Sequence, residues 1–216
     1  MKVDMVKILP YKSYSEARQR ADKIVRDVRN HKKIKGRYKF FVLPIGSQAR
    51  RCVVQDYKGK YDLDYQIILT CNSREGDRNP TQIKKDFMQA FTDCSNHNER
   101  VEDSTTVITV RCSKNAGKFD AKQEKFSFDF VILNIDQNMR IRRNGQNQYT
   151  WVQLPSKNLE IYRKFNSLTV VQQKDLLETD LLPKVVEEKK KDEGNRRATI
   201  ELFYNAVNTY CQRNRV

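Results

Sequence analysis

The run Tyr61–Leu69 is the feature that most constrains the fold of this chain. Polar and apolar residues alternate at its start and its end is fully apolar, a pattern typical of a β-strand near the centre of a sheet. Asp62 and Asp64 are two residues apart, so their side chains point to the same face of that sheet. Neighbouring carboxylates repel each other, and a hard divalent cation such as Mg²⁺ makes the pair tolerable. The strand therefore predicts a sheet with a charged face.

Strand and helix patterns surround this segment. Further strands are expected at 38–43, ended by Pro44, and at 105–112, 125–133, 139–143 and 148–152, the last two joined by a tight turn at Asn144-Gly145. Helices are expected at 13–32, begun by a capping box from Ser13 to Glu16, at 48–54, and from Asn79-Pro80 to about 96. Beyond 155 the pattern is helical, at 158–165, at 169–191 with a bend near Pro183, and at 196–213. The predicted class is α+β, a mixed β-sheet flanked by helices with a small C-terminal helical subdomain.

Composition excludes several classes of protein. The chain has 216 residues, of which 38% are hydrophobic, enough for a real core, and no apolar stretch approaches the roughly 20 residues of a membrane span. The N-terminus lacks the pattern of a signal peptide, so we expect a soluble, cytoplasmic protein without a membrane partner. Five scattered cysteines and two histidines predict reduced thiols and no zinc site.

Positive charge is concentrated near the N-terminus. The net charge is +15, and residues 1–60 hold 17 Lys and Arg against 5 Asp and Glu. The predicted helix 13–32 supplies much of this excess on the side opposite its apolar stripe, through Arg18, Arg20, Lys23, Arg26 and Arg29. Such asymmetry favours contact with phosphates, either of a polynucleotide or of a nucleotide triphosphate. The alternative is a solvated basic helix.

A third acid strengthens the metal-site prediction. Asp129 lies within an apolar strand, which is an expensive place for a charge that has no partner. Gly46-Ser47 forms a turn before the Asp62 strand, where glycine lets backbone N–H groups approach phosphates and serine adds a donor. Three acids, a glycine-serine turn and a basic cluster are what two-metal nucleotidyl transfer requires.

These motifs resemble those of the DNA polymerase β-like nucleotidyltransferase superfamily. The matching positions are Gly46, Ser47, Asp62, Asp64 and Asp129. Gly46-Ser47-Gln48-Ala49-Arg50-Arg51 is similar to the Gly-Ser-x-x-Arg form of bacterial members, including cyclic-oligonucleotide synthases of antiphage defence. The resemblance implies a nucleotidyltransferase-type catalytic core at 1–154 and a helical subdomain at 155–216 that closes over the base. Two departures are the basic Arg50-Arg51-Cys52 and the short C-terminal part, which speak against a cyclic product.

The resemblance and the residue chemistry together assign roles. Asp62 and Asp64 are expected to bind two Mg²⁺ ions, with Mn²⁺ as an alternative, and Asp129 the catalytic ion that favours deprotonation of the acceptor hydroxyl. Gly46 and Ser47 are expected to bind the triphosphate. The cations expected to neutralise phosphates are Arg50 or Arg51 with Lys58 or Lys60. Tyr149 and Trp151 either stack on a base or pack against a helix.

The predicted function is Mg²⁺-dependent transfer of a nucleoside monophosphate from an NTP to an acceptor. RNA is one acceptor, bound through the basic N-terminal helix. Two enzymatic alternatives are synthesis of a nucleotide second messenger and modification of a protein or drug in a defence or toxin system. The alternative from another class is a non-catalytic nucleic-acid-binding module. Retention of three acids that repel phosphate argues against that module.

Overall fold

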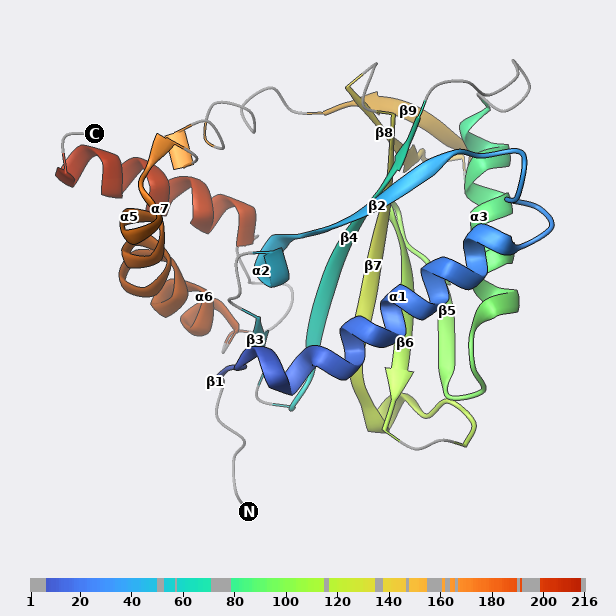
Figure 1. The fold of residues 1–216 in the computed structure, drawn as a ribbon, viewed down its shortest axis with the longest axis horizontal. Coiled ribbons are helices and arrows are strands. Elements are labelled where there is room, and N and C mark those ends of the chain that lie inside the picture. Colours follow the sequence, from blue (N-terminus) through green and yellow to red (C-terminus); the bar gives the residue numbers. More distant parts are fainter. Residues whose placement is uncertain are drawn as a thin grey trace.

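The computed structural model describes residues 7–49, 53–56, 58–70, 79–114, 117–134, 138–146, 148–154, 161, 164–165, 167–189, 191 and 199–214. Its main feature is a seven-stranded sheet in the order β2-β4-β7-β6-β5, with β8 beside β7 and β9 beside β8 (Figure 1). The strands are β2 (Phe40–Ile45), β4 (Tyr61–Leu69), β5 (Glu99–Asp103), β6 (Val107–Ser113), β7 (Glu124–Asn134), β8 (Met139–Arg143) and β9 (Tyr149–Gln153). A separate ribbon pairs β1 (Lys7–Ile8) with β3 (Val54–Gln55).

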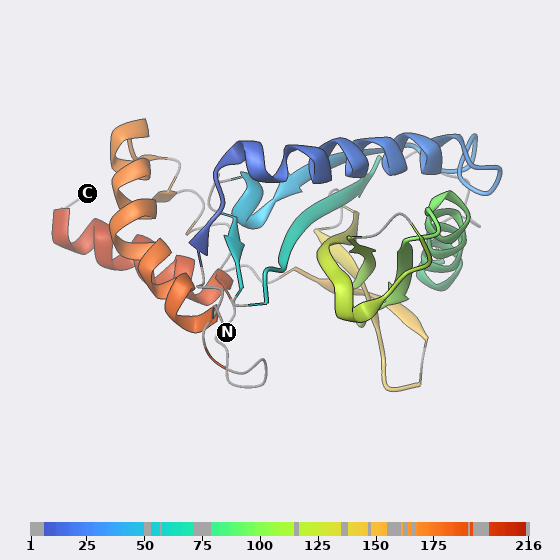
Figure 2. The same cartoon turned by 90° about the horizontal axis from the view of Figure 1, so that it is seen from below.

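Helices lie on one face of the sheet and beside one end of it. The α-helices are α1 (Ser15–Asn30), α2 (Gly46–Ala49), α3 (Pro80–Cys94), α5 (Val170–Asp175), α6 (Leu182–Lys189) and α7 (Thr199–Asn214). A 3-10 turn (Tyr11–Tyr14) precedes α1, another (Ala121–Gln123) precedes β7, and a π-helical segment (Leu176–Leu181) joins α5 to α6. α1 runs along the sheet, whereas α5, α6 and α7 form a group near α2 and β3 (Figures 1 and 2). None of the helices in the described residues is long and apolar enough to cross a membrane.

The sheet is mixed because β4 and β7 run parallel, while β2, β5, β6, β8 and β9 pair antiparallel with their neighbours. Strands that are parallel neighbours need a long crossover, and here the chain between β4 and β7 contains α3, β5 and β6. The predicted α+β class, with a mixed sheet flanked by helices, is confirmed.

Alternation along the central strands divides the sheet into two faces. Tyr61, Leu63, Tyr65 and Ile67 of β4 are buried in one core with the apolar stripe of α1. In β7 the corresponding residues are Phe128, Phe130 and Ile132, and the Phe130 ring lies 4.6 Å from the ring of Phe91 in α3. Because side chains alternate, the acidic residues of both strands lie on the opposite face. We call this face, which carries Asp62, Asp64 and Asp129, the acid face.

A second apolar cluster holds the C-terminal helices together. Its members include Leu176, Leu202 and Phe203, and Val54 of β3 joins the same cluster. The predicted division of the chain at 154/155 stays a prediction, and residues 155–160 lie outside the described part, as does most of the predicted helix 158–165.

The long helix predicted at 169–191 forms, with a π-turn just before Pro183. The Leu182 N–H donates to the Leu177 carbonyl, five residues back. A proline lacks the N–H and clashes with the carbonyl four residues earlier, so widening the preceding turn lets the helix continue.

Several expected element boundaries are wrong. The Ser13–Glu16 capping box does not form: Tyr14 is the N-cap of α1 and makes no side-chain capping bond. Pro44 lies inside β2 instead of ending it, which an edge strand permits. The helix expected at 48–54 begins at Gly46 as α2, which ends at Ala49, and Val54 belongs to β3. β5 was not expected, because Val101 is its only apolar residue.

Arg20 was expected on the exposed side of the basic helix, and this is wrong. Its guanidinium pairs with Glu99 of β5 at 2.5 Å, and the Arg20 and Glu99 side chains are only 14% and 2% exposed. The pair therefore ties α1 to the sheet, and the exposed basic residues of α1 are fewer than the sequence suggests.

Truncating Arg20 should leave the Glu99 carboxylate buried without its cation. We expect Arg20→Ala to lower the free energy of unfolding by about 3 kcal/mol. Arg26→Ala, an exposed position of the same helix, should change it by less than about 0.5 kcal/mol. Urea unfolding of both variants measures the difference, and equal effects would show that the Arg20–Glu99 pair does not anchor α1.

Candidate active site

Register brings the three acids of the acid face together. In the parallel pair β4–β7, Asp64 lies directly opposite Asp129, and Asp62 lies opposite Ser127. Neighbouring strands are about 4.8 Å apart, so the three carboxylates originate from adjacent points of one surface. Asp62 is exposed, while Asp64 and Asp129 are half-buried. The sequence-predicted carboxylates therefore share one accessible patch.

Hydroxyl groups orient two of these carboxylates. Ser127 Oγ donates to Asp62 Oδ1 at 2.6 Å, and Thr109 Oγ1 donates to Asp129 Oδ1 at 2.6 Å. Thr109 is the register partner of Asp129 on β6. The backbone of Asp64 is held by Gln48 of α2, whose side-chain amide donates to the Asp64 carbonyl at 2.6 Å. Neither Thr109 nor Ser127 was predicted from the sequence, although each occupies an acid-face position in an alternating strand.

Gly46 packs against the acid site. It follows β2 directly, has a φ of 64°, and a Cβ at this position would lie 3.2 Å from Asp64 Cγ and closer still to Asp64 Oδ2. Glycine is therefore needed both for the backbone conformation and for the space taken by the Asp64 carboxylate. Ser47, the next residue, is half-buried in α2.

The electrostatics of Asp129 favour a cation nearby. Burial raises the pKa of the Asp129 carboxyl and the charge of Asp62 adds to this, whereas the Thr109 hydrogen bond and the Arg111 charge lower it. Oxygen ligands and excess negative charge suit a hard divalent ion such as Mg²⁺ or Mn²⁺. Within the described residues, no three Asp, Glu, His or Cys side chains form a ready-made metal-binding group. Asp62 and Asp129 instead accept hydrogen bonds from the hydroxyls of Ser127 and Thr109.

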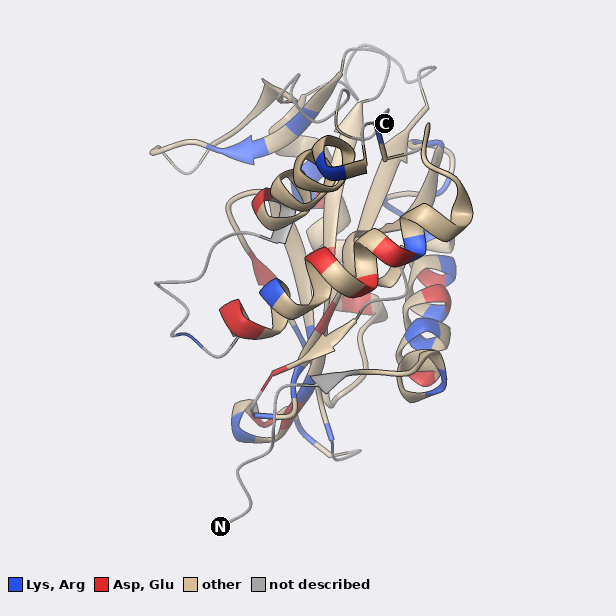
Figure 3. Ribbon diagram, turned by 90° about the vertical axis from the view of Figure 1, so that its left-hand side faces the viewer, with Lys and Arg blue, Asp and Glu red and all other residues tan. Residues whose placement is uncertain are grey.

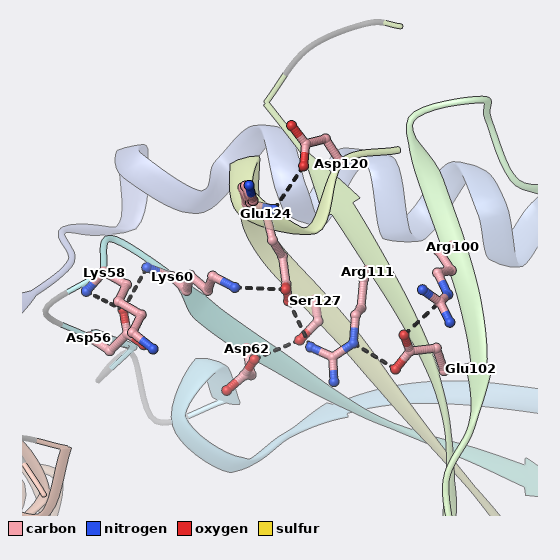
Figure 4. A network of polar contacts seen from close by, with 11 residues as sticks. Asp56, Lys58, Lys60, Asp62, Arg100, Glu102, Arg111, Asp120, Glu124 and Ser127 are labelled. Carbon is pink, nitrogen blue, oxygen red and sulfur yellow. Dashed lines mark hydrogen bonds and ion pairs between the residues drawn. The ribbon is translucent and has the colours of Figure 1, made fainter. Parts of the chain in front are cut away.

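A chain of ion pairs crosses the acid face beside these carboxylates (Figure 4). Lys60 Nζ contacts Glu124 Oε2 at 2.8 Å, and Arg111 Nη1 contacts Glu124 Oε1 at 2.8 Å. Arg111 Nε also contacts Glu102 at 2.7 Å, and Arg100 Nε lies 3.4 Å from the same carboxylate. Lys60 was predicted from the sequence, but Arg111 was not. The one sequence signal for Arg111 is its position two residues after Thr109 in an alternating strand.

The other predicted phosphate-binding residues are only partly placed. Arg50 and Arg51 lie outside the described residues. Lys58 is exposed in a turn where Asp56 Oδ1 accepts the N–H groups of Lys58 and Lys60. Lys60 is half-buried and its ammonium group is paired with Glu124, so it reaches the acid site as part of the ion-pair chain.

The basic helix lies on the face opposite the acids. α1 packs on the side of the sheet that carries Leu63 and Tyr65, and in Figure 3 its blue bands of Lys and Arg lie at the right-hand edge of the molecule. Arg18 stacks on Tyr11, and Arg29 stacks on Phe40 at 5.2 Å. The basic helix was predicted to lie beside the acids. This is wrong, because the sheet separates α1 from them.

The structure also places Tyr149 and three of the five cysteines. Tyr149 is buried, with Lys84 of α3 5.4 Å from its ring and its hydroxyl bonded to Asp103, which fits packing against a helix. Cys94, Cys112 and Cys211 are free thiols, while Cys52 and Cys71 lie outside the described residues.

Asp129→Asn should stabilise the metal-free protein. Because the pKa of Asp129 is raised on folding, the folded state binds this proton more tightly and the ionised carboxylate opposes folding. We expect a gain of about 1 kcal/mol at pH 7, which shrinks as the pH falls and Asp129 becomes protonated in both states. Asp22→Asn, an exposed control, should change little. Urea unfolding with a chelator at pH 7 and pH 4 is the measurement, and a less stable Asp129→Asn variant at pH 7 would contradict this account.

Gly46→Ala should disrupt the site beyond the cost of its backbone conformation. Gly36 is the matched control, because it also has a positive φ, 78°, but nothing lies within 4 Å of a Cβ there. Each alanine should cost about 1 kcal/mol through φ, and Gly46→Ala should cost more because it displaces the Asp64 carboxylate. Thermal unfolding compares the two, and equal losses would show that Gly46 does not support Asp64.

Comparison with known proteins identifies the fold. No family model and no curated protein matches the sequence. Among solved structures, Vibrio cholerae DncV in its 3′-deoxy ATP bound form is 15% identical with a TM-score of 0.56, over 91% of this chain and 52% of that one. DncV cyclic AMP-GMP synthase with the linear intermediate 5′ pppA(3′,5′)pG is 14% identical with a TM-score of 0.55, over 92% and 54%.

A third similar structure is the Bradyrhizobium diazoefficiens CD-NTase CdnG in complex with GTP. It is 15% identical with a TM-score of 0.51, over 76% of this chain and 43% of that one. The chain thus spans about half the length of the structures it matches. The likeness shows that this chain has the fold of the DncV and CdnG structures.

Proposed function

We propose that this protein is a divalent-metal-dependent nucleotidyltransferase that transfers a nucleoside monophosphate from an NTP to the hydroxyl of a second nucleotide. The observation that carries the proposal is the acid face, where Asp64 and Asp129 are register partners, Asp62 lies beside them and Gly46 packs on Asp64. The similar structures contain GTP, a 3′-deoxy ATP and a linear dinucleotide, which supports a nucleotide as both donor and acceptor.

The acids have distinct roles in this proposal. Asp62 and Asp64 would hold two Mg²⁺ ions, or Mn²⁺, and Asp129 would hold the one nearer the acceptor. When bound, such ions neutralise phosphate charge and stabilise the attacking and leaving oxygens. The Ser127 and Thr109 hydroxyls keep Asp62 and Asp129 oriented through their hydrogen bonds.

In the proposed reaction one bond to the α-phosphorus forms and another breaks. The acceptor oxygen forms a bond to the α-phosphorus, the bond from that phosphorus to the bridging oxygen breaks, pyrophosphate leaves, and the hydroxyl proton passes to water. Gly46 and Ser47 bind the β- and γ-phosphates. Arg50, Arg51 and Lys58 assist them, while Lys60 contributes through its pair with Glu124.

Residues 1–154 form the catalytic core and 155–216 the helical subdomain that covers the base. We place the protein in the cytoplasm, where NTPs are available and free thiols such as Cys112 stay reduced.

A nucleotide is favoured over RNA as the acceptor by the position of α1. The exposed cations Lys23, Arg26 and Arg29 lie on α1, across the sheet from the acids. A polynucleotide bound along α1 would therefore not present its 3′ end to Asp129. Synthesis of a small nucleotide product, the second-messenger alternative, fits this geometry better than RNA extension.

The test incubates the protein with Mg²⁺ or Mn²⁺ and each α-labelled NTP, with and without total RNA. We expect a labelled small nucleotide product that is absent from the Asp62→Ala/Asp64→Ala variant. Arg26→Glu/Arg29→Glu should leave product formation unchanged, because these residues lie across the sheet. Label on RNA would contradict the nucleotide acceptor, and absence of transfer with every NTP would contradict the enzymatic proposal.

A further inference from the structure

Arg111 lies on the acid face at the side of β7 away from β4. It is the register partner of Ser127, whose hydroxyl holds Asp62, and it is two residues from Thr109, which holds Asp129. Opposite residues of antiparallel strands have Cβ atoms about 5 Å apart, so the Arg111 side chain starts close to both acids. The side chain is 37% exposed, and the nucleotidyl transfer proposed above does not yet use it.

Two carboxylates hold the Arg111 guanidinium in one orientation. Glu102 accepts from Nε at 2.7 Å and Glu124 accepts from Nη1 at 2.8 Å (Figure 4). These bonds use Nε and Nη1, and Nη2 makes no hydrogen bond with any residue in the described part of the chain. Glu124 is shared with Lys60, whose ammonium group lies 2.8 Å from Oε2. A rigid guanidinium with spare N–H donors is a geometry suited to a phosphate oxygen.

The order of the strands indicates which of the two substrates lies nearer to the Arg111 guanidinium. Gly46 and Ser47 follow β2, and the order β2-β4-β7-β6 puts Arg111 on the other side of the acids. Two intervening strands separate these positions by about 14 Å, roughly three strand spacings. In-line displacement requires the leaving pyrophosphate and the attacking hydroxyl on opposite sides of the α-phosphorus. With the triphosphate at Gly46, the attacking group comes from the side of Arg111.

We propose that Arg111 is a specificity-determining residue that binds a phosphate of the acceptor nucleotide through Nη2. The inference rests on the proposed nucleotidyl transfer and adds the class of acceptor. Acceptors that carry a phosphate near the attacking hydroxyl are selected, and nucleosides, protein hydroxyls and uncharged drugs are disfavoured. Glu102 and Glu124 act as positioning residues for the guanidinium.

The test uses acceptor pairs that differ only in a phosphate. The donor is α-labelled 3′-deoxy ATP, which has no 3′ hydroxyl, and the acceptors are each of the four nucleoside monophosphates and its nucleoside. Wild type should prefer the monophosphate by about tenfold or more in kcat/KM, as expected for one hydrogen bond between charged groups. Arg111→Gln should bring this ratio close to one while the KM of the donor stays unchanged.

Arg100→Gln is the matched control. Arg100 pairs with the same Glu102 and is the register partner of Arg111 on β5, but its side chain is 62% exposed and lies one strand further from the acids. Its ratio should equal that of wild type. Arg111→Lys keeps the positive charge but lacks the planar guanidinium, so it should retain part of the preference for the monophosphate. If thermal unfolding shows that Arg111→Gln does not fold, the preference of Arg111→Lys is compared with that of wild type instead.

The outcomes separate the two proposals. Transfer by wild type with no preference for the monophosphate, or an equal loss of preference in the Arg111 and Arg100 variants, overturns the role of Arg111 and leaves nucleotidyl transfer standing. Absence of transfer to every acceptor by wild type, with each α-labelled NTP also tried as donor, overturns both.

Discussion

Parallel pairing of β4 with β7 is the constraint on which the rest of the site depends. It sets Asp64 opposite Asp129 and Asp62 opposite Ser127, although more than sixty residues separate these partners in the chain. A shift of one residue would turn Asp129 into the core and bring Phe128 or Phe130 to the surface. The aromatic contacts of Phe130 with Phe91 and Tyr65 oppose such a shift. The core thereby fixes the geometry of the acids.

The site conflicts with stability, and neighbouring residues reduce the conflict without removing it. Ser127 and Thr109 satisfy one oxygen each of Asp62 and Asp129, but burial and mutual repulsion still raise the pKa of Asp129. The ion pairs of Lys60 and Arg111 with Glu124 lie beside the acids, and both cations already have a carboxylate partner. A divalent ion with a nucleotide would supply the charge that the chain itself does not place there.

Local patterns predict part of this structure well. The bounds of β4 follow from its alternation, and the start of α3 follows from Asn79, whose side chain accepts from the N–H groups of Thr81 and Gln82. Features that depend on register could not be predicted. Arg111 meets Glu102 and Glu124 only because β5, β6 and β7 are neighbours, and an amphipathic α1 shows that it packs without showing on which face of the sheet.

The central claim is that the acid face binds divalent ions and the triphosphate of a nucleotide. A crystal structure with Mn²⁺ and a non-hydrolysable NTP tests it most directly, because Mn²⁺ is located by its anomalous scattering. The account predicts anomalous peaks in contact with Asp62, Asp64 and Asp129, and triphosphate density beside Gly46 and Ser47. Ions and nucleotide bound elsewhere, such as along α1, with no anomalous peak in contact with these carboxylates, would contradict it.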